Sequence, residues 1–352
     1  MENHALIVGV TGIAGSNLAE HLLAKGGWKI SGLSRSESPV KGVETLKCDL
    51  TDAASVSAAL TGVRPTHVFI TAWSRQETED QNCKVNGGIV RNVLDALRER
   101  GLRHVALVTG TKHYLGPFES YAKVAPETPF REEQERLANQ NFYYVQEDEV
   151  FSAAEREGFT WTVHRPHTLI GYAVGNAMNM AATLGVYASI CKETGTPFTF
   201  PGSAEQWRAA TDVTDARILA SQLTWAATTP EAADLAFNIV NGDVFRWKWL
   251  WPRIADYFGI EAAPYSGSPE PLVIKMAEAA PVWDALVVKH GLKTNSLSRV
   301  ASFWHTDADL GRQVETFNDV GRSRKLGFLD YQDTTESFTD AFDRLRADRI
   351  IP

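Results

Sequence analysis

The fold of this chain is decided near its beginning, by the stretch His4-Ala5-Leu6-Ile7-Val8-Gly9-Val10-Thr11-Gly12-Ile13-Ala14-Gly15. Its first five residues are mostly apolar and partly β-branched, which predicts a buried parallel strand. Three glycines spaced three residues apart predict a tight turn, and an apolar helical pattern begins at Ser16. Strand, turn and helix together predict a dinucleotide site with its pyrophosphate at the helix N-terminus. The alternative is an ordinary glycine-rich turn without a cofactor. We expect the cofactor to contact Gly9, Thr11, Gly12, Ile13, Ala14 and Gly15.

Strands and helices are expected to alternate after this turn. Apolar strand patterns cover 29–33, 68–72, 104–109 and 160–165, and helical patterns cover 85–96 and 142–157. This alternation predicts an α/β protein with a Rossmann-type, doubly wound parallel sheet. At 352 residues the chain is long for a single core, so we also expect a second lobe.

The second strand is followed by Ser34-Arg35, where NAD-binding proteins tend to carry an acidic residue. Arg35 instead offers a cation for a 2′-phosphate, which predicts NADPH as the cofactor. The alternative is that Arg35 is a solvated surface charge. Asp49 and Leu50 follow the third strand, where they would bracket the adenine, although Asp49 is equally suited to cap the next helix.

Ligands of such sheets bind at the carboxyl ends of the strands. The strand ends here are Thr71-Ala72-Trp73, Thr109-Gly110 and Arg165-Pro166, and we expect all of these residues to line the cofactor crevice.

Composition excludes several classes of protein. The chain is 44% hydrophobic and 22% charged, with a net charge of −8, which argues against nucleic acid as a partner. The longest apolar run, 177–191, carries polar residues and predicts a buried helix rather than a membrane span. Cys48, Cys83 and Cys191 are too scattered for a disulfide framework or a metal cluster. No signal-peptide pattern is present, so we expect a cytoplasmic protein without a metal.

The reactive residues depart from a common pattern. Enzymes with this opening often use a Tyr followed four residues later by a Lys, and the sequence contains no Tyr-x-x-x-Lys. Lys112 stands just after the fifth strand, and Tyr143 begins a predicted helix. A phenol near an ammonium can bind a developing oxyanion, so both are candidate catalytic residues. Each also has an ordinary interpretation, Lys112 as a solvated charge and Tyr143 as a core aromatic.

Two segments carry a family resemblance, Thr109-Gly110-Thr111-Lys112-His113-Tyr114-Leu115-Gly116-Pro117-Phe118-Glu119-Ser120-Tyr121 and Asn141-Phe142-Tyr143-Tyr144-x-x-Glu147-Asp148. They resemble motifs of the progesterone 5β-reductase and iridoid synthase family, atypical short-chain dehydrogenases that reduce activated carbon–carbon double bonds with NADPH. Further matches at 161–166, 186–192, 237–248 and 326–328 extend the resemblance over nearly the whole chain.

The resemblance implies that Lys112 and Tyr143, rather than Tyr144, form the catalytic pair. Hydride would add to the β-carbon of an enone, and the two residues would stabilise the resulting enolate. The resemblance also implies a last strand at 237–240. The nucleotide-binding domain would then comprise 1–165 plus 210–242, and a smaller, mainly helical substrate lobe would comprise 166–209 plus 243–352.

The implied substrates are small hydrophobic enones and 4-ene-3-keto steroids. The implied substrate pocket consists of Trp73, Leu115, Phe118, Tyr121, Phe303 and Trp304. Alternatives are a carbonyl reductase or nucleotide-sugar epimerase on the same scaffold, or a protein that senses NADPH without catalysis. A homodimer is left open as an alternative to a monomer. We interpret His113 as a hydrogen-bonded scaffold residue rather than a general acid, and the cluster Trp247, Trp249 and Trp251 as core packing rather than a substrate cage.

Overall fold

The computed structural model describes residues 3–117, 126–173, 175–176, 178–293 and 296–352. At its centre is a seven-stranded sheet in the order β3-β2-β1-β4-β5-β6-β9, and every pair of neighbours is parallel. The strands are β1 (Asn3–Val8), β2 (Trp28–Ser34), β3 (Glu44–Lys47), β4 (His67–Ile70), β5 (His104–Val108), β6 (Thr160–Pro166) and β9 (Leu235–Ile239). The prediction of a doubly wound parallel sheet is therefore confirmed.

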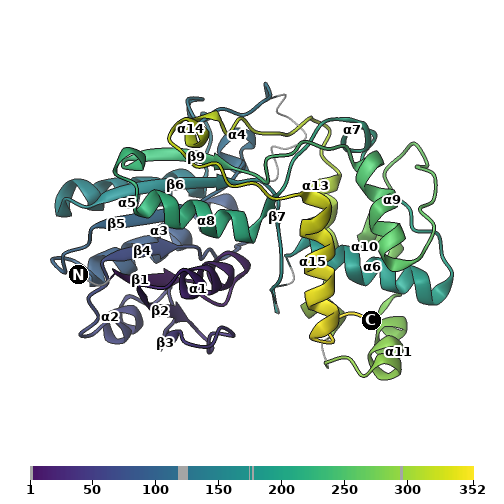
Figure 1. Cartoon of the computed structure of the whole chain (residues 1–352), viewed down its shortest axis with the longest axis horizontal. Helices are drawn as coiled ribbons and strands as arrows, with labels where there is room; N and C mark the ends of the chain where they lie inside the picture. The colour runs from purple at the N-terminus through teal and green to yellow at the C-terminus, as the bar shows by residue number, and fades with distance from the viewer. Residues whose placement is uncertain (1–2, 118–125, 174, 177, 294–295) are drawn as a thin grey trace.

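Helices cover both faces of this sheet, as Figure 1 shows. α1 (Ile13–Lys25) packs beside α8 (Ala216–Ala227) on one face, and α3 (Glu79–Ala96) packs beside α5 (Phe142–Glu157) on the other. The alternation of strand side chains explains the two layers. In β1, Ala5 and Ile7 join the core beneath α1 and α8, whereas Leu6 and Val8 join the core beneath α3. α2 (Ala53–Ala59) lies against α3.

A second, mainly helical region has its own core. It is built chiefly from α6 (Met180–Thr194), α9 (Trp247–Phe258), α11 (Ala280–His290), α13 (Phe303–Leu310) and α15 (Thr334–Ala347). The short elements are α4 (Lys112–Leu115), α7 (Ala204–Arg208), α10 (Leu272–Lys275), α12 (Leu297–Val300), α14 (Gly321–Lys325), η2 (Pro230–Ala232), β7 (Leu169–Ile170) and β8 (Thr214–Asp215). In Figure 1, α15 stands between the sheet and the group of α6, α9 and α11.

The aromatic residues of α9 settle one sequence-based alternative. Trp247 and Trp251 are buried in the helical core, and the Trp251 ring stacks on Phe198 with centroids 4.3 Å apart. Trp249 faces outward and is 44% exposed, with the Arg253 guanidinium over its ring. Core packing is thus confirmed for the two buried tryptophans.

The structure decides between the two interpretations of Asp49. The N-cap of α2 is Asp52, whose side chain accepts from Ala54 N, so Asp49 does not cap that helix. The N-cap of α8 is Asp215, whose side chain accepts from Arg217 N. The sequence could not distinguish Asp49 from Asp52, because the side chain of either aspartate can accept a capping bond.

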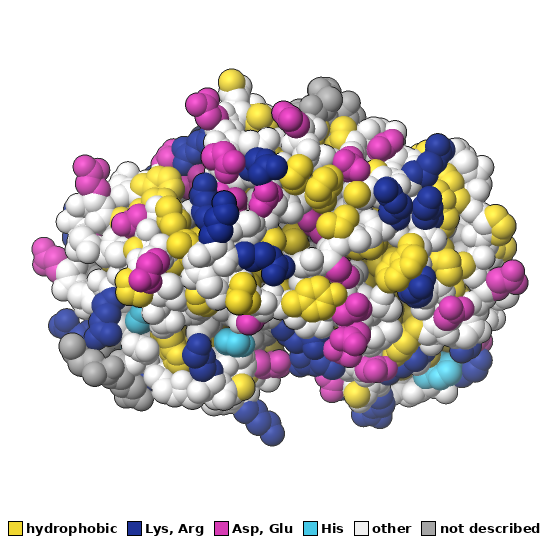
Figure 2. All heavy atoms as spheres, turned by 45° about the horizontal axis from the view of Figure 1, so that its top comes forward, with side chains coloured by type: hydrophobic (Ala, Val, Ile, Leu, Met, Phe, Trp, Pro, Cys, Tyr) yellow, Lys and Arg dark blue, Asp and Glu magenta, His cyan; other side chains and the backbone are white. Residues whose placement is uncertain are grey.

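The expected partition into two domains stays a prediction. β9 is hydrogen-bonded to β6 at the edge of the sheet, as that partition requires. The chain also returns to the sheet near its end, since Phe328 packs in the core beneath α1 and α8. Among the described residues, no helix is both long and apolar enough to cross a membrane. On the face drawn in Figure 2, basic and acidic side chains are interspersed among apolar ones.

Candidate active site

The turn between β1 and α1 has no room for a side chain at Gly9 or Gly15. Gly9 has φ +89°, and a Cβ there would lie 2.8 Å from the Cβ of Ala72. A Cβ on Gly15 would lie 2.3 Å from the carbonyl oxygen of Gly9. The Gly12 amide donates to the Gly9 oxygen at 3.0 Å and closes the turn. Only glycine allows the backbone to fold this tightly.

The start of α1 fits the pyrophosphate of a dinucleotide. Gly12 is its N-cap and offers no side-chain hydrogen bond, and the first helical bond runs from Ser16 N to Gly12 O. The amides of Ile13 and Ala14 therefore precede the helical ladder, and both residues line a cavity. No acidic side chain lies in the first turn of the helix. Partial positive charge at an open N-terminus favours an anion.

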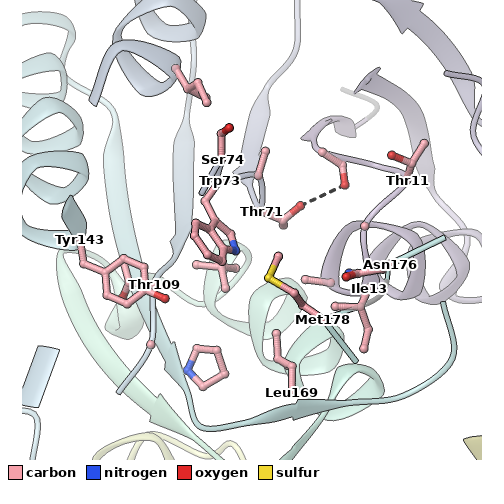
Figure 3. Close-up of a pocket in the computed structure, with 18 of the residues that line it drawn as sticks. Thr11, Ile13, Thr71, Trp73, Ser74, Thr109, Tyr143, Leu169, Asn176 and Met178 are labelled. Carbon is pink, nitrogen blue, oxygen red and sulfur yellow. Dashed lines mark hydrogen bonds between the residues drawn. The ribbon is translucent and has the colours of Figure 1, made fainter. Parts of the chain in front are cut away.

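This cavity has a volume of about 580 Å³ and opens at the carboxyl ends of the central strands. It brings together most of the residues predicted from the sequence. In Figure 3, the Tyr143 and Trp73 rings lie on one side, and Thr11, Ile13 and Asn176 lie on the other. The predicted residues that line it are Gly9, Thr11, Gly12, Ile13, Ala14, Ser34, Arg35, Asp49, Leu50, Thr71, Ala72, Trp73, Thr109, Gly110, Lys112, Tyr143 and Pro166.

One end of the cavity is formed by the loops after β2 and β3. Asp49 accepts hydrogen bonds from the Thr51 hydroxyl at 2.7 Å and the Thr51 amide at 2.9 Å. These bonds, the hydroxyl's above all, hold the pKa of Asp49 below its ordinary value, so it is a carboxylate at neutral pH. Arg35 is exposed at the edge of the cavity and forms no ion pair with any described carboxylate. Its charge is thus available to a ligand.

Lys112 sits among aromatic rings at the other end. The side chain is buried, and Nζ lies 4.9 Å from the ring centroid of Phe142, 5.3 Å from that of Trp73 and 5.9 Å from that of Tyr143. Trp73 stacks on Phe142 with centroids 5.5 Å apart. Ring faces attract an ammonium and exclude water from it. The arrangement places a positive charge beside the Tyr143 ring.

Gly110 allows Tyr143 to approach the end of β5. A Cβ on Gly110 would lie 3.2 Å from the Tyr143 hydroxyl oxygen and 3.1 Å from the Pro166 carbonyl oxygen. The phenol is therefore packed against bare backbone at the mouth of the strands, and Figure 3 shows it directed into the cavity beside Thr109.

Two buried hydrogen bonds join the segment of Lys112 to the segment of Tyr143. Asn141 Nδ2 donates to the Lys112 carbonyl oxygen at 2.8 Å, while its Oδ1 accepts from Tyr143 N and caps α5. The Tyr144 hydroxyl donates to His113 O at 2.6 Å and accepts from Leu137 N at 3.0 Å. Tyr144 is thus occupied as a tether, and only Tyr143 of the two faces the cavity.

Several predicted residues lie away from the cavity. Gly15 packs against the backbone of Gly9 inside the turn, and Leu115 packs with Tyr114 and Phe130. Phe303 packs against the helical core, while Trp304 lies under the Arg75 guanidinium at 3.7 Å. Phe118 and Tyr121 are outside the described residues.

Arg165 is also absent from the cavity wall. Its buried guanidinium donates to the Tyr114 hydroxyl at 3.2 Å and lies 3.6 Å from Glu147. His113 lies in the same buried cluster, with Nε2 3.3 Å from Gln134 O. Burial, followed by the charge of Arg165, lowers the pKa of His113 to about 3, so its imidazole is neutral. This placement matches a scaffold role better than that of a general acid.

One polar face of the cavity was not predicted from the sequence. We call it the C-terminal wall, and it consists of His167, Thr168, His305, Asp309 and Arg312. Arg312 Nη1 lies 2.7 Å from His167 Nε2, and Arg312 also pairs with Asp309. Thr168 donates to Asp309 at 2.8 Å.

Behind this wall, His167 Nδ1 lies 2.7 Å from a carboxylate oxygen of Asp212. Arg312 can only donate, so His167 Nε2 accepts its hydrogen bond. The proton of His167 is therefore on Nδ1, which donates a hydrogen bond to Asp212. His167 directly follows the end of β6, which was a usable signal. Residues 305–312 gave no such signal, because a helical segment far along the chain brings them to the cavity.

Comparison with known proteins finds one family model and several similar proteins. Residues 41–352 match the family model described as a PRISE-like Rossmann-fold domain. The chain is 40% identical to an (S)-8-oxocitronellyl enol synthase of Camptotheca acuminata, over 99% of this chain and 93% of that protein. It is also 40% identical to a 3-oxo-Delta(4,5)-steroid 5-beta-reductase of Arabidopsis thaliana, over 100% of this chain and 94% of that protein.

Solved structures share the fold at low identity. The epimerase Mth375 of Methanothermobacter thermautotrophicus superposes with a TM-score of 0.70 at 16% identity, covering 98% of this chain and 93% of that one. The UDP-glucose 4-epimerase of Thermus thermophilus, solved with NAD, superposes with a TM-score of 0.67 at 17% identity, covering 97% and 99%.

Proposed function

This chain belongs to the family of PRISE-like Rossmann-fold proteins, and from that premise we propose that it is an NADPH-dependent ene-reductase. It reduces the carbon–carbon double bond of an activated enone by 1,4-addition of hydride. The family resemblance inferred from the sequence is confirmed. Two of its relatives are named as an enol synthase and a steroid 5-beta-reductase, and both names describe compounds with an oxo group.

The observation that carries the proposal is the pairing of Tyr143 with Lys112 in one cavity wall. Tyr144 is engaged with backbone atoms, so the phenol that can meet a substrate is that of Tyr143. The buried ammonium of Lys112 supplies the positive charge.

NADPH, when bound, supplies the hydride. The Tyr143 hydroxyl donates a hydrogen bond to the carbonyl oxygen of the enone and orients it. As the β-carbon gains hydride, the electron pair of the double bond shifts and negative charge develops on that oxygen. Tyr143 and the charge of Lys112 stabilise this enolate, and they do so strongly because Trp73 and Phe142 exclude water. A proton from water then reaches the α-carbon and completes the saturated ketone.

The cofactor site follows from the glycine turn and Arg35. The open start of α1 holds the pyrophosphate, and Asp49 and Leu50 border the adenine. Arg35 pairs with a 2′-phosphate, which NADH lacks. The substrate is a small hydrophobic enone, with 4-ene-3-keto steroids as a second class to test.

Two other functions remain as outcomes of the test. A carbonyl reductase or an epimerase would use the same scaffold, but the chain lacks the Tyr-x-x-x-Lys pair that such enzymes often use. A protein that only senses NADPH would not need a tyrosine and a lysine directed at one cavity.

The test is NADPH oxidation with 2-cyclohexen-1-one and with progesterone. Products are identified by chromatography against authentic saturated ketone and allylic alcohol, because these two isomers have the same mass. We expect the saturated ketone. Tyr143→Phe should lower kcat by about 100-fold, the usual effect of removing one oxyanion donor. Tyr265→Phe is the matched control, because it removes a hydroxyl that bonds Gly202 O outside the cavity.

An allylic alcohol as product would overturn conjugate reduction in favour of carbonyl reduction. Tight NADPH binding without turnover of any enone would favour the sensing protein. Full turnover by Tyr143→Phe would remove Tyr143 from the mechanism.

A further inference from the structure

His305 is the residue of the C-terminal wall that the proposed reaction does not use. It belongs to α13 and lines the same cavity as Lys112 and Tyr143. Its neighbour Trp304 meets it edge to face, with ring centroids 5.6 Å apart. Residues far apart in the sequence thus place an imidazole beside a reactive pair.

The proton on His305 can be assigned from its surroundings. Nδ1 is buried and has no hydrogen-bond partner among the described residues. A buried N–H without an acceptor costs about 1–3 kcal/mol, whereas a bare acceptor is tolerated more often. The proton therefore lies on Nε2. Nε2, unlike Nδ1, is not a buried atom without a partner, and His305 lines the cavity, so we infer that this N–H faces the cavity.

His305 is neutral at physiological pH. Burial lowers its pKa most, Asp309 opposes this, and the charges of Arg312, Lys112 and Arg75 lower it further. The imidazole is therefore a neutral donor rather than a cation. His305 and Lys112 both line the same cavity.

The rest of the wall restricts what His305 can bind. Burial raises the pKa of Asp309, but the charge of the adjacent Arg312 opposes it and the pKa lies below its ordinary value, so Asp309 is ionised. Arg312 is in turn held by Asp309 and His167. The buried ion pair of Arg312 and Asp309 has no net charge, so it offers no positive charge to an anionic ligand. A neutral oxygen is the matching partner for this surface.

We propose that His305 Nε2–H binds a second, neutral oxygen of the substrate, a hydroxyl or a carbonyl, remote from the enone carbonyl held by Tyr143. The inference rests on the proposed function and narrows its substrate class to enones that carry another oxygen function. His305 is thereby a specificity-determining residue. An enone without that oxygen leaves the imidazole N–H unpaired in a closed site, which lowers its affinity.

The test uses a matched pair of linear enones, (E)-oct-3-en-2-one and (E)-8-hydroxyoct-3-en-2-one. We expect wild-type protein to favour the hydroxylated compound by about tenfold or more in kcat/KM, a typical value for one hydrogen bond. In His305→Phe this ratio should fall towards one. His305→Gln, which keeps an N–H donor near the position of Nε2, should recover part of it.

His290→Phe is the control, because it makes the same substitution at the exposed end of α11 and should keep the wild-type ratio. An equal preference of wild type and His305→Phe for the hydroxylated compound would overturn the role of His305. So would a wild-type ratio near one.

A binding measurement separates this inference from the reaction itself. Calorimetric titration of the NADP⁺ complex with the two saturated ketones, octan-2-one and 8-hydroxyoctan-2-one, reports the preference without turnover. If neither enone is reduced, the proposed reaction fails. The calorimetric ratio, and its loss in His305→Phe, then still supports or overturns the second-oxygen site.

Discussion

The two walls of the cavity are built in different ways. The glycine wall, residues 9–15, is one continuous segment that presents backbone amides and a helix N-terminus. The C-terminal wall combines two residues after β6 with three from the segment 305–312, and it presents side chains held by one another. Recognition by backbone requires glycine at fixed spacing, so it is visible in the sequence. Recognition by side chains can be changed by one substitution without altering the chain path.

The largest expected effect comes from adding one methyl group inside the glycine wall. Gly15→Ala would place a Cβ 2.3 Å from the Gly9 carbonyl oxygen, where only backbone could yield. We expect a loss of about 3 kcal/mol or more in the free energy of unfolding, together with loss of NADPH binding. Denaturant titration and a fluorescence titration with NADPH measure the two effects.

Two other glycine-to-alanine substitutions serve as comparisons for Gly15→Ala. A Cβ on Gly12 would lie 3.4 Å from the Gly9 oxygen, so Gly12→Ala should fold; because Gly12 lines the cavity, we expect it to bind NADPH more weakly. Gly88→Ala in α3 meets no atom within 4 Å and should be neutral, or stabilising by up to about 1 kcal/mol. A Gly15→Ala protein as stable as Gly88→Ala would show that the turn is less tight than described.

Acid should destabilise the protein through three histidines of the sheet. Burial lowers the pKa of His67 to about 4, of His104 to about 3 and of His164 to about 4, and all three belong to the central strands. The unfolded chain binds these protons near pH 6.5, and the folded sheet does not. Stability should therefore be constant above about pH 6.5. Below it, stability should fall by about 1.4 kcal/mol per pH unit for each histidine.

Denaturant titrations between pH 4.5 and 8 check this slope. His104→Gln should reduce the slope by about one proton, because a glutamine side chain does not titrate. A stability that stays level down to pH 4.5 would contradict the assignment of these histidines as neutral and buried.

The tether between the two reactive segments should show a smaller effect. Asn141→Ala removes both the cap of α5 and the bond to the Lys112 carbonyl oxygen. We expect kcat to fall by about tenfold or more at little change in KM, because misplacement of a catalytic group affects the transition state most. Stability should fall by about 1 kcal/mol from the lost cap.

Asn141→Ser separates the two roles. A serine can cap the helix, so stability should recover, but its short side chain leaves Lys112 untethered and kcat should stay low. If Asn141→Ser restored kcat together with stability, the residue would be a cap and not a positioning residue.

The smallest expected effect concerns the edge of the cofactor site. Arg35→Ala should weaken NADPH binding by about tenfold and leave NADH binding unchanged, because only NADPH has the 2′-phosphate. Arg64→Ala, also an exposed arginine but outside the cavity, is the control. Equal losses for the two cofactors in Arg35→Ala would show that Arg35 does not recognise the 2′-phosphate.

The sequence by itself determined the sheet, the glycine turn and the placing of Lys112 and Tyr143. These features rest on local patterns, because periodicity of apolar residues and glycine spacing act over a few neighbouring positions. The helix expected at 142–157 agrees with α5, and Lys112 directly follows the end of β5 through a short turn.

Only the tertiary structure decided which side chains share the cavity. It separated Tyr143 from Tyr144 by giving the second hydroxyl to His113 and Leu137. It placed the Arg165 side chain in a buried cluster with Glu147, and it placed His305 in the cavity that Lys112 and Tyr143 line. Such choices depend on contacts between separate segments of the chain, 31 residues apart for Tyr144 and His113 and 51 residues apart for Arg165 and Tyr114. No local pattern encodes them, because the free energy that selects them comes from packing and pairing in the folded chain.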